Sequence, residues 1–264
     1  MITVRLRFYE ELNDLLPPKI RKRPFERNFL LPTTIKDVIQ SCGVPHTEVD
    51  LILVNGRSVT FDYQIQDQDR VSIYPVFESL DISSIVRLQE RPLRRLRFRV
   101  DVPLKTLARR MRLMGLDVLY EENLQSMALV QRVVAEGRVL LTRQRQLLMP
   151  NMLQRGYWVH ALEPLDQTVE VIKRFDLAQS LKPFARCIPC NGPLHPVPKA
   201  SVQDCLAPLT KQYYAEFFQC SACGRVYWKG SHYMALREFI NQVTERLAQE
   251  DVLHESIPRG KEDV

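Results

Sequence analysis

The chain opens with an alternating pattern of apolar and polar side chains. Apolar residues occupy every second position from Ile2 to Phe8, which is the period-two pattern of a half-buried strand. Thr33 or Thr34 can cap a short helix that ends near Gly43. Further strands are expected at 50–54 and 70–76, with turn residues at 55–56 and 68–69. Strands, one central helix and more strands predict a β-grasp fold over residues 1–80.

The pattern changes in the middle of the chain. Residues 81–93 are polar and predict a linker. Beyond them, strands are expected at 96–100, 118–120, 139–142 and 157–162, and helices at 104–114, 124–135 and 166–175. Repeated strand–helix units over 94–180 predict an α/β domain with a parallel sheet and helices on both faces. In such sheets, ligands bind at the carboxyl ends of the strands.

Two pairs of cysteines with metal-ligand spacing follow. Each pair is a C-x2-C knuckle, and 29 residues separate the pairs, which are formed by Cys187, Cys190, Cys220 and Cys223. Four thiolates complete a tetrahedral structural zinc site with no open position, whereas the alternative is four unrelated free thiols. The sequence therefore predicts a zinc ribbon with an amphipathic C-terminal helix over 181–250, and a polar tail over 251–264.

Composition narrows the classes of protein. The chain has 264 residues, of which 45% are hydrophobic and 26% charged, as in globular proteins. No apolar run approaches the roughly 18–20 residues needed to cross a membrane, and the start lacks a secretory pattern. We therefore expect a cytoplasmic protein with no membrane partner. Thiols stay reduced in the cytoplasm, which favours metal ligands over disulfides.

Basic residues are concentrated between Arg87 and Arg112. This segment contains ten Lys and Arg residues and only two acidic residues, within a chain of net charge +6. An anionic partner is expected, with RNA as the leading candidate and a solvated basic face as the alternative. Lys105, Arg109 and Arg112 fall on one helical face. After the second knuckle, the sequence combines aromatic and polar side chains at Trp228, Lys229 and His232. Such combinations occur in sites that stack on the bases and pair with the phosphates of single-stranded RNA. The alternative for these aromatic side chains is packing against the ribbon.

Two segments of the first 80 residues carry a resemblance. ILVNGRSV at 52–59 and DRVSIYPVF at 69–77 resemble the small sulfur carriers of the ThiS and MoaD type. Those carriers act through a C-terminal Gly-Gly, and no glycine pair stands at the equivalent point, 77–80. We therefore expect an interaction module that docks a protein partner.

Motifs from the rest of the chain resemble a ribonuclease family. FRVD at 98–101, EGRVLLTR at 136–143, the two knuckles and CGRVYWKGSH at 223–232 are similar to the Mut-seven C-terminal ribonucleases. The resemblance implies a PIN-like nuclease fold, an appended zinc ribbon and an N-terminal ubiquitin-like domain. It also implies metal-assisted phosphodiester cleavage, with carboxylates at strand ends holding Mg²⁺ or Mn²⁺.

The resemblance places Asp101 at the matching acidic position of the catalytic site. Two other acidic positions are replaced, because the second helix opens with 125–128 (QSMA) and the expected Thr-Arg-Asp turn ends in Gln144. A neutral amide is a weaker ligand for a hard cation. The carboxylates that could complete the site are Glu121, Glu122 and Glu163, with solvated surface carboxylates as the alternative, and Arg143 is a candidate RNA-binding residue.

Three hypotheses follow. The first is an RNA-binding protein of this PIN-like, zinc-ribbon family that has weak or no nuclease activity. The second is an active Mg²⁺- or Mn²⁺-dependent endoribonuclease that uses Asp101 and rearranged glutamates. The third is a protein-interaction adaptor that works through the ubiquitin-like domain. PIN-like domains often pair, so a homo-oligomer is compatible with each hypothesis.

Overall fold

The computed structural model describes residues 1–75 and 96–255, with side chains up to residue 249. The predicted linker, the basic residues at 87–95 and most of the predicted tail lie outside these ranges. The described residues form two compact units. Unit 1 lies within 1–101 and 123–158, and unit 2 lies within 102–122 and 159–264. None of the helices described is both long and apolar enough to span a membrane.

A five-stranded mixed sheet occupies the first part of unit 1. Its strands, in the spatial order β2-β1-β5-β3-β4, are β1 (Ile2–Phe8), β2 (Phe25–Phe29), β3 (Val49–Val54), β4 (Arg57–Ser58) and β5 (Arg70–Pro75). β1 pairs in parallel with β5 and antiparallel with β2, and β3 runs antiparallel to β5 and β4. This is the predicted β-grasp arrangement, with β2 and β4 added.

One helix, α1 (Ile35–Ser41), supplies buried residues to the core of this sheet. The Thr34 hydroxyl accepts a hydrogen bond from the Asp37 backbone N–H at 3.2 Å, so Thr34 is the cap among the two threonines that the sequence allows. Asn55 and Gly56 have φ of 49° and 82°, which the tight turn between β3 and β4 requires. Local capping and turn chemistry therefore explain both features.

Unit 1 also contains a parallel sheet. β6 (Phe98–Val100), β8 (Val139–Thr142) and β9 (Gly156–Trp158) lie side by side in that order. The buried apolar residues of α3 (Ser126–Glu136) share a core with Leu140 of β8, and the helix ends at Gly137, whose φ is 59°. The parallel sheet with crossover helices confirms the predicted α/β class, although β9 is shorter than the strand expected at 157–162.

Specific contacts connect the two sheets of unit 1. The amide of Gln40 donates to the Met149 carbonyl at 2.8 Å, and His46 Nε2 lies 2.8 Å from the Leu153 carbonyl. The backbone N–H of Trp158 donates to Glu48 Oε1 at 2.7 Å. The β-grasp domain is therefore bonded to the α/β domain through the segment around β9.

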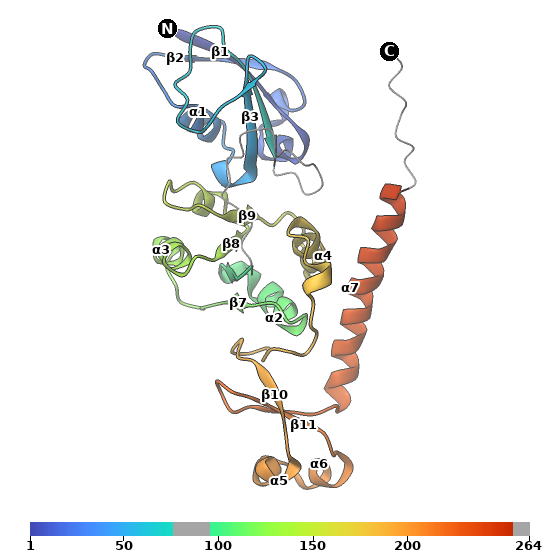
Figure 1. The fold of residues 1–264 in the computed structure, drawn as a ribbon. Coiled ribbons are helices and arrows are strands. Elements are labelled where there is room, and N and C mark those ends of the chain that lie inside the picture. Colours follow the sequence, from blue (N-terminus) through green and yellow to red (C-terminus); the bar gives the residue numbers. More distant parts are fainter. Residues whose placement is uncertain (76–95, 256–264) are drawn as a thin grey trace. The chain divides into compact units, whose positions relative to one another are not determined.

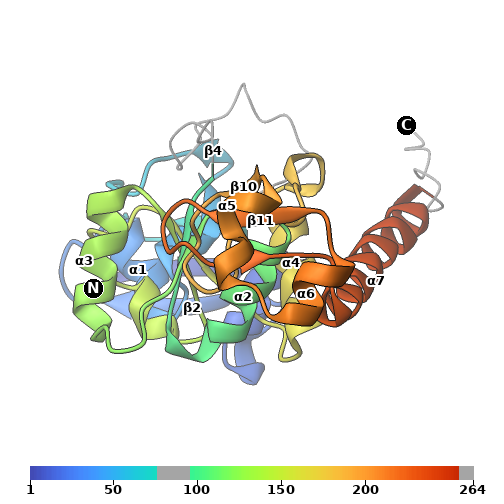
Figure 2. The same ribbon diagram turned by 90° about the horizontal axis from the view of Figure 1, so that it is seen from below.

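Unit 2 is built on helices. Outside the zinc ribbon it contains the helices α2 (Lys105–Leu113), α4 (Pro164–Arg174) and α7 (Ser231–Glu255), and the two-residue strand β7 (Val118–Leu119). α4 contacts both α2 and α7, as the two ribbon views show for α4 and α7 (Figures 1 and 2). Gly115 ends α2 with φ of 89°, where a side chain would meet the Lys182 carbonyl oxygen. α7 extends to Glu255 and so includes the first residues of the predicted tail.

The zinc-ribbon part of unit 2 is a small antiparallel sheet. β10 (Leu194–Val197), β11 (Phe217–Cys220) and β12 (Val226–Tyr227) pair in that order. α5 (Lys199–Val202) and α6 (Pro208–Tyr213) lie beside β10 and β11 (Figures 1 and 2). Val202, Leu206 and Phe217 form its core. Short 3-10 helices cover Glu10–Leu15, Pro18–Ile20, His46–Glu48, Val102–Leu104, Arg145–Leu148, Ala178–Ser180 and Gln203–Cys205.

Candidate functional site

The four predicted cysteine ligands meet at one point of unit 2. All four Sγ atoms lie within 4.8 Å of one another. The Cys187 and Cys223 sulfurs are 3.7 Å apart, and those of Cys190 and Cys220 are 3.4 Å apart. Tetrahedral zinc with bonds of about 2.3 Å places its sulfurs about 3.8 Å from one another. The cluster therefore fits a metal ion of this size without rearrangement.

Backbone turns explain why each knuckle can close. The residues after the second cysteine of each pair, Asn191 and Gly224, have φ of 69° and 71°. Their backbone N–H groups donate to the Cys187 and Cys220 carbonyls, both of which open a knuckle. A Cβ on Gly192 would lie 2.7 Å from Cys220 Sγ, so only glycine allows the backbone this close to the cluster.

The groups around the sulfurs act in opposite directions, because burial raises the pKa of Cys187 and raises that of Cys190 to about 12, whereas other contacts favour thiolate. The Tyr227 hydroxyl lies 3.0 Å from Cys187 Sγ. Burial, together with this contact, raises the pKa of Tyr227, so its hydroxyl stays protonated and donates to the sulfur. Burial opposes ionisation of Cys220, but backbone N–H groups of Cys223 and Ala222 lower its pKa to about 7. Thiolate is the form that binds metal.

Arg112 connects the first knuckle to α2. Its side chain is 4% exposed, and it donates from Nε to the Val118 carbonyl at 2.8 Å. Nη1 donates to the carbonyls of Ile188 at 2.9 Å and Pro189 at 2.7 Å. Since the guanidinium is buried among carbonyls, it is not on the RNA-facing surface that the sequence predicts. Its role in the structure is to hold the knuckle.

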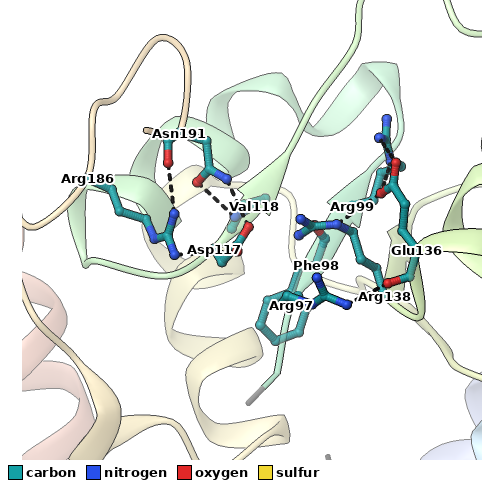
Figure 3. A network of polar contacts seen from close by, with 9 residues as sticks. All are labelled: Arg97, Phe98, Arg99, Asp117, Val118, Glu136, Arg138, Arg186 and Asn191. Atoms are coloured by element: carbon teal, nitrogen blue, oxygen red, sulfur yellow. Dashed lines mark hydrogen bonds and ion pairs between the residues drawn. The ribbon is translucent and has the colours of Figure 1, made fainter. Parts of the chain in front are cut away.

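A second set of bonds holds the same knuckle against β7 (Figure 3). Asn191 accepts from the Val118 backbone N–H at 3.1 Å and donates to Asp117 Oδ1 at 2.9 Å. Arg186 donates to the Asn191 carbonyl at 2.8 Å and pairs with Asp117. The metal centre and the α2–β7 segment therefore share one polar network.

Asp101 follows directly after β6 and is 3% exposed. Oδ2 accepts from the Thr142 hydroxyl at 2.6 Å and from the Gln144 amide at 3.4 Å. Oδ1 is buried, and no group in the described part of the chain forms a hydrogen bond with it. Burial raises the pKa of the Asp101 carboxyl, against the opposing effect of Thr142. Asp101 thus has one buried oxygen without a hydrogen-bond partner among the described residues, and neutral side chains bonded to the other.

The remaining predicted acids belong to unit 2. Glu121, Glu122 and Glu163 are exposed, and Glu122 pairs with Lys105 at 2.8 Å. Glu163 directly precedes α4. Within the ranges 1–75 and 96–249, the cysteine cluster is the one group of at least three His, Cys, Asp or Glu side chains that could hold a metal. Among the described residues, neither unit by itself therefore contains a cluster of three or more carboxylates for Mg²⁺ or Mn²⁺.

The predicted cations have different environments. Arg109 is exposed, whereas Arg143 is half-buried. Arg97 donates to the Glu136 carbonyl at 2.6 Å, and Arg99 pairs with the Glu136 carboxylate at 2.6 Å (Figure 3). Two residues of the basic stretch, Arg97 and Arg99, therefore form bonds within unit 1 that connect β6 to the end of α3.

The ribbon residues Trp228, Lys229 and His232 are all exposed and line one cavity of about 620 Å³. The other lining residues were not predicted as site residues, and Phe184 and Arg225 are two of them. Arg225 lies within the quoted CGRVYWKGSH motif and could have been selected for its charge. Phe184 lies in the segment before the first knuckle, where the sequence has no signal for it.

Comparisons with known proteins give two family models and one solved structure. The Mut7-C RNAse domain model matches residues 96–240, and the Mut7-C ubiquitin model matches residues 1–81. A solved structure described as a putative molybdopterin converting factor, subunit 1, from Pyrococcus furiosus is 20% identical, covering 29% of this chain and 100% of its own, at a TM-score of 0.24. A search of curated proteins gives no match. Because the RNAse domain model spans more than half of a chain that also has the ubiquitin-like domain and the four-cysteine cluster, this protein belongs to the Mut7-C RNAse domain family.

Proposed function

We propose that this protein binds RNA and that its metal-dependent cleavage is weak or absent. The observation that carries the proposal is the surroundings of Asp101. Its bonded neighbours are the Thr142 hydroxyl and the Gln144 amide, which carry no charge. Membership of a ribonuclease family supports an RNA-related role, and the neutral neighbours argue against efficient catalysis.

The charge of the site explains this expectation. Mg²⁺ and Mn²⁺ are hard cations that in nucleases are held by several oxygen ligands, of which carboxylates contribute the charge. Asp101 is a single buried carboxylate, and burial raises its pKa. A single carboxylate supplies only one negative charge for a divalent cation, so we assign no catalytic step to such an ion.

We also propose that the cysteine cluster holds zinc in a structural role. Four sulfur ligands are typical of zinc, and a full tetrahedral set leaves no position for a substrate. Binding of the ion would then contribute folding free energy and no catalysis. The buried positions of Cys187 and Cys220 agree with that role.

The RNA contacts in this proposal are the accessible cations and aromatics. They are Lys105, Arg109, Arg143, Trp228, Lys229 and His232. Arg112 is excluded because its donors are occupied by backbone carbonyls. Lys105 and Lys229 are paired with exposed glutamates, and exposed ion pairs exchange partners readily.

A second candidate, an active nuclease, is favoured by Asp101 Oδ1. A buried carboxylate oxygen without a hydrogen-bond partner among the described residues, on an acid whose pKa is raised, is typical of functional sites. In this candidate, Glu121, Glu122 and Glu163 supply the missing carboxylates.

One assay separates the two candidates. Purified full-length protein is mixed with labelled single-stranded RNA in Mn²⁺ or Mg²⁺, and binding and cleavage are scored together. Asp101→Asn is the test variant, since asparagine keeps an acceptor for Thr142. Asp204→Asn, at an exposed position, is the matched control. The proposal predicts salt-sensitive binding without cleavage in all three proteins. Cleavage lost only in Asp101→Asn would establish the nuclease, and absence of RNA binding would refute the proposal.

A further inference from the structure

A cavity of about 620 Å³ opens where the zinc ribbon meets the start of α7. Phe184 and Tyr233 form one wall, with ring centroids 4.8 Å apart and planes 28° from parallel. Tyr227, Trp228 and Leu236 contribute further apolar surface. A cavity of this size and lining falls in the usual range of ligand sites, roughly 300–1,000 Å³.

The charged groups of the lining share one sign. Arg225 and Lys229 are its exposed cations, His232 adds an exposed imidazole, and the lining residues, all within the described chain, include no Asp or Glu. Lys229 pairs with Glu216 at 2.6 Å, but the two side chains are 54% and 67% exposed. Such a pair in water is weak, so Lys229 can turn to a phosphate. The charge of the cavity favours an anionic ligand over an apolar peptide side chain.

Contacts outside the cavity hold two of the aromatic residues in place. The Tyr227 hydroxyl contacts the cysteine cluster, where it lies 3.0 Å from Cys187 Sγ. The Trp228 indole covers Gly230, where a Cβ would lie 2.7 Å from Nε1, so only glycine leaves room for the ring. Trp228 remains 38% exposed. A fixed, partly exposed aromatic surface stacks on a base at little entropic cost.

We propose that this cavity binds one nucleotide of single-stranded RNA. Its base stacks against the aromatic side chains, and its phosphates pair with the cations at the rim. The inference rests on the proposed RNA binding, and it goes further by assigning the place at which an unpaired base binds. The mixture of stacking surface and cations is the chemistry of single-strand recognition, which duplex RNA with its paired bases does not satisfy.

Trp228 itself supplies the readout. The chain has two tryptophans, so Trp158→Phe leaves Trp228 as the sole indole. This full-length variant is titrated with a ten-uridine RNA and, separately, with a ten-residue abasic strand that has the same phosphates. We expect the RNA to quench Trp228 fluorescence and the abasic strand to bind about tenfold more weakly without quenching it.

Substitutions test the same point in the native background. Trp228→Ala and Tyr233→Ala are each expected to weaken binding of the ten-uridine RNA about tenfold in a gel-shift assay. Tyr213→Ala is the matched control, because Tyr213 is 70% exposed in the same unit and does not line the cavity. It should bind like the native chain, and circular dichroism verifies folding of each variant.

The outcomes separate this inference from the proposed function. Full RNA affinity in both cavity variants, without quenching of Trp228, would overturn the inference and leave RNA binding standing. No RNA binding in any protein would overturn both. A change of oligomeric state in Trp228→Ala, with RNA affinity unchanged, would assign the cavity to a second copy of the chain and also overturn the inference.

Discussion

The arginines of α2 show that equal charges on one helix can have unequal roles. Arg109 is exposed, whereas Arg112 is 4% exposed and bonded to three carbonyls. Arg110 lies between these extremes, with its guanidinium 4.1 Å from the Phe239 ring centroid. Their spacing in the sequence gives no indication of this difference.

The first prediction contrasts two of these arginines. Arg112→Met should lower the free energy of unfolding by about 2–4 kcal/mol, because it leaves the buried Val118 carbonyl and two partly buried carbonyls without this donor. Arg109→Met should leave stability nearly unchanged and weaken RNA binding. Chemical denaturation measures the first effect and gel shift the second. Equal stability of the two variants would contradict the structural role of Arg112.

The second prediction concerns the metal ligands. On the proposal that the cluster holds zinc, Cys220→Ser should lose the ion and have a lower melting temperature, because three thiolates no longer close the tetrahedron. Cys205→Ser is the control, since Cys205 is exposed and outside the cluster. Elemental analysis of both purified variants gives the metal content. Stoichiometric zinc in Cys220→Ser would show that the ion does not need this ligand.

At the scale of elements, the contact between α1 and the segment before β9 depends on a neutral histidine. The Leu153 carbonyl can only accept, so His46 Nε2 carries the proton and Nδ1 accepts from the Gln40 amide. Burial, assisted by the charge of Lys36, lowers the pKa of His46 to about 4. Protonation would remove the acceptor and place a charge in this contact.

The third prediction follows from that pKa. Unfolded His46 titrates near 6.5, above its folded value, so the unfolded state takes up the proton first. The stability it contributes is complete above pH 6.5 and is lost as the pH falls towards 4, by about 1–2 kcal/mol at pH 5. Denaturation of the native chain and of His46→Gln at several pH values measures this loss. A similar decline in both proteins would mean that other groups cause it.

Elements with strong local signals were predictable from the sequence. The Thr34 cap, the Asn55–Gly56 turn and the glycines after α2 and α3 fix helices and turns through backbone chemistry alone. β2, β4 and the helices α5 and α6 were not predicted. β4 spans two residues and α5 four, which is too short for a period to be read. Tertiary pairing, not local sequence, defines them.

The residues of the candidate site also fall into two groups, those that the local sequence predicts and those that depend on distant contacts. The four metal ligands were predictable because two C-x2-C knuckles fix both chemistry and local geometry. The surroundings of Asp101 depend on which side chains the fold brings to it, so only the match to a known family suggested its role. The burial of Arg112 and the position of Phe184 arise from contacts distant in sequence. Helical spacing cannot reveal them.

For the whole molecule, salt dependence distinguishes RNA binding from an adaptor role. Phosphate contacts on single strands give an affinity that falls with salt at a log–log slope of about −0.7 per contact. We expect a steep slope for the native chain and a slope reduced by about 0.7 in Lys229→Gln. Fluorescence anisotropy at several salt concentrations measures both. A flat response would favour a protein-docking role for the ubiquitin-like domain.

The polar network shared by the first knuckle, α2 and β7 has a consequence for how the ribbon fits against α2 and β7. Arg112 and the Val118 backbone N–H have their partners in residues 188–191. Removal of the ribbon as a cassette would therefore take away the partners of Arg112 Nη1 and of the Val118 N–H, and leave the bond from Arg112 Nε to the Val118 carbonyl as the remaining bond of this guanidinium. The surface that α2 and β7 present to the ribbon is thus polar, and the ribbon and this surface are matched through hydrogen bonds.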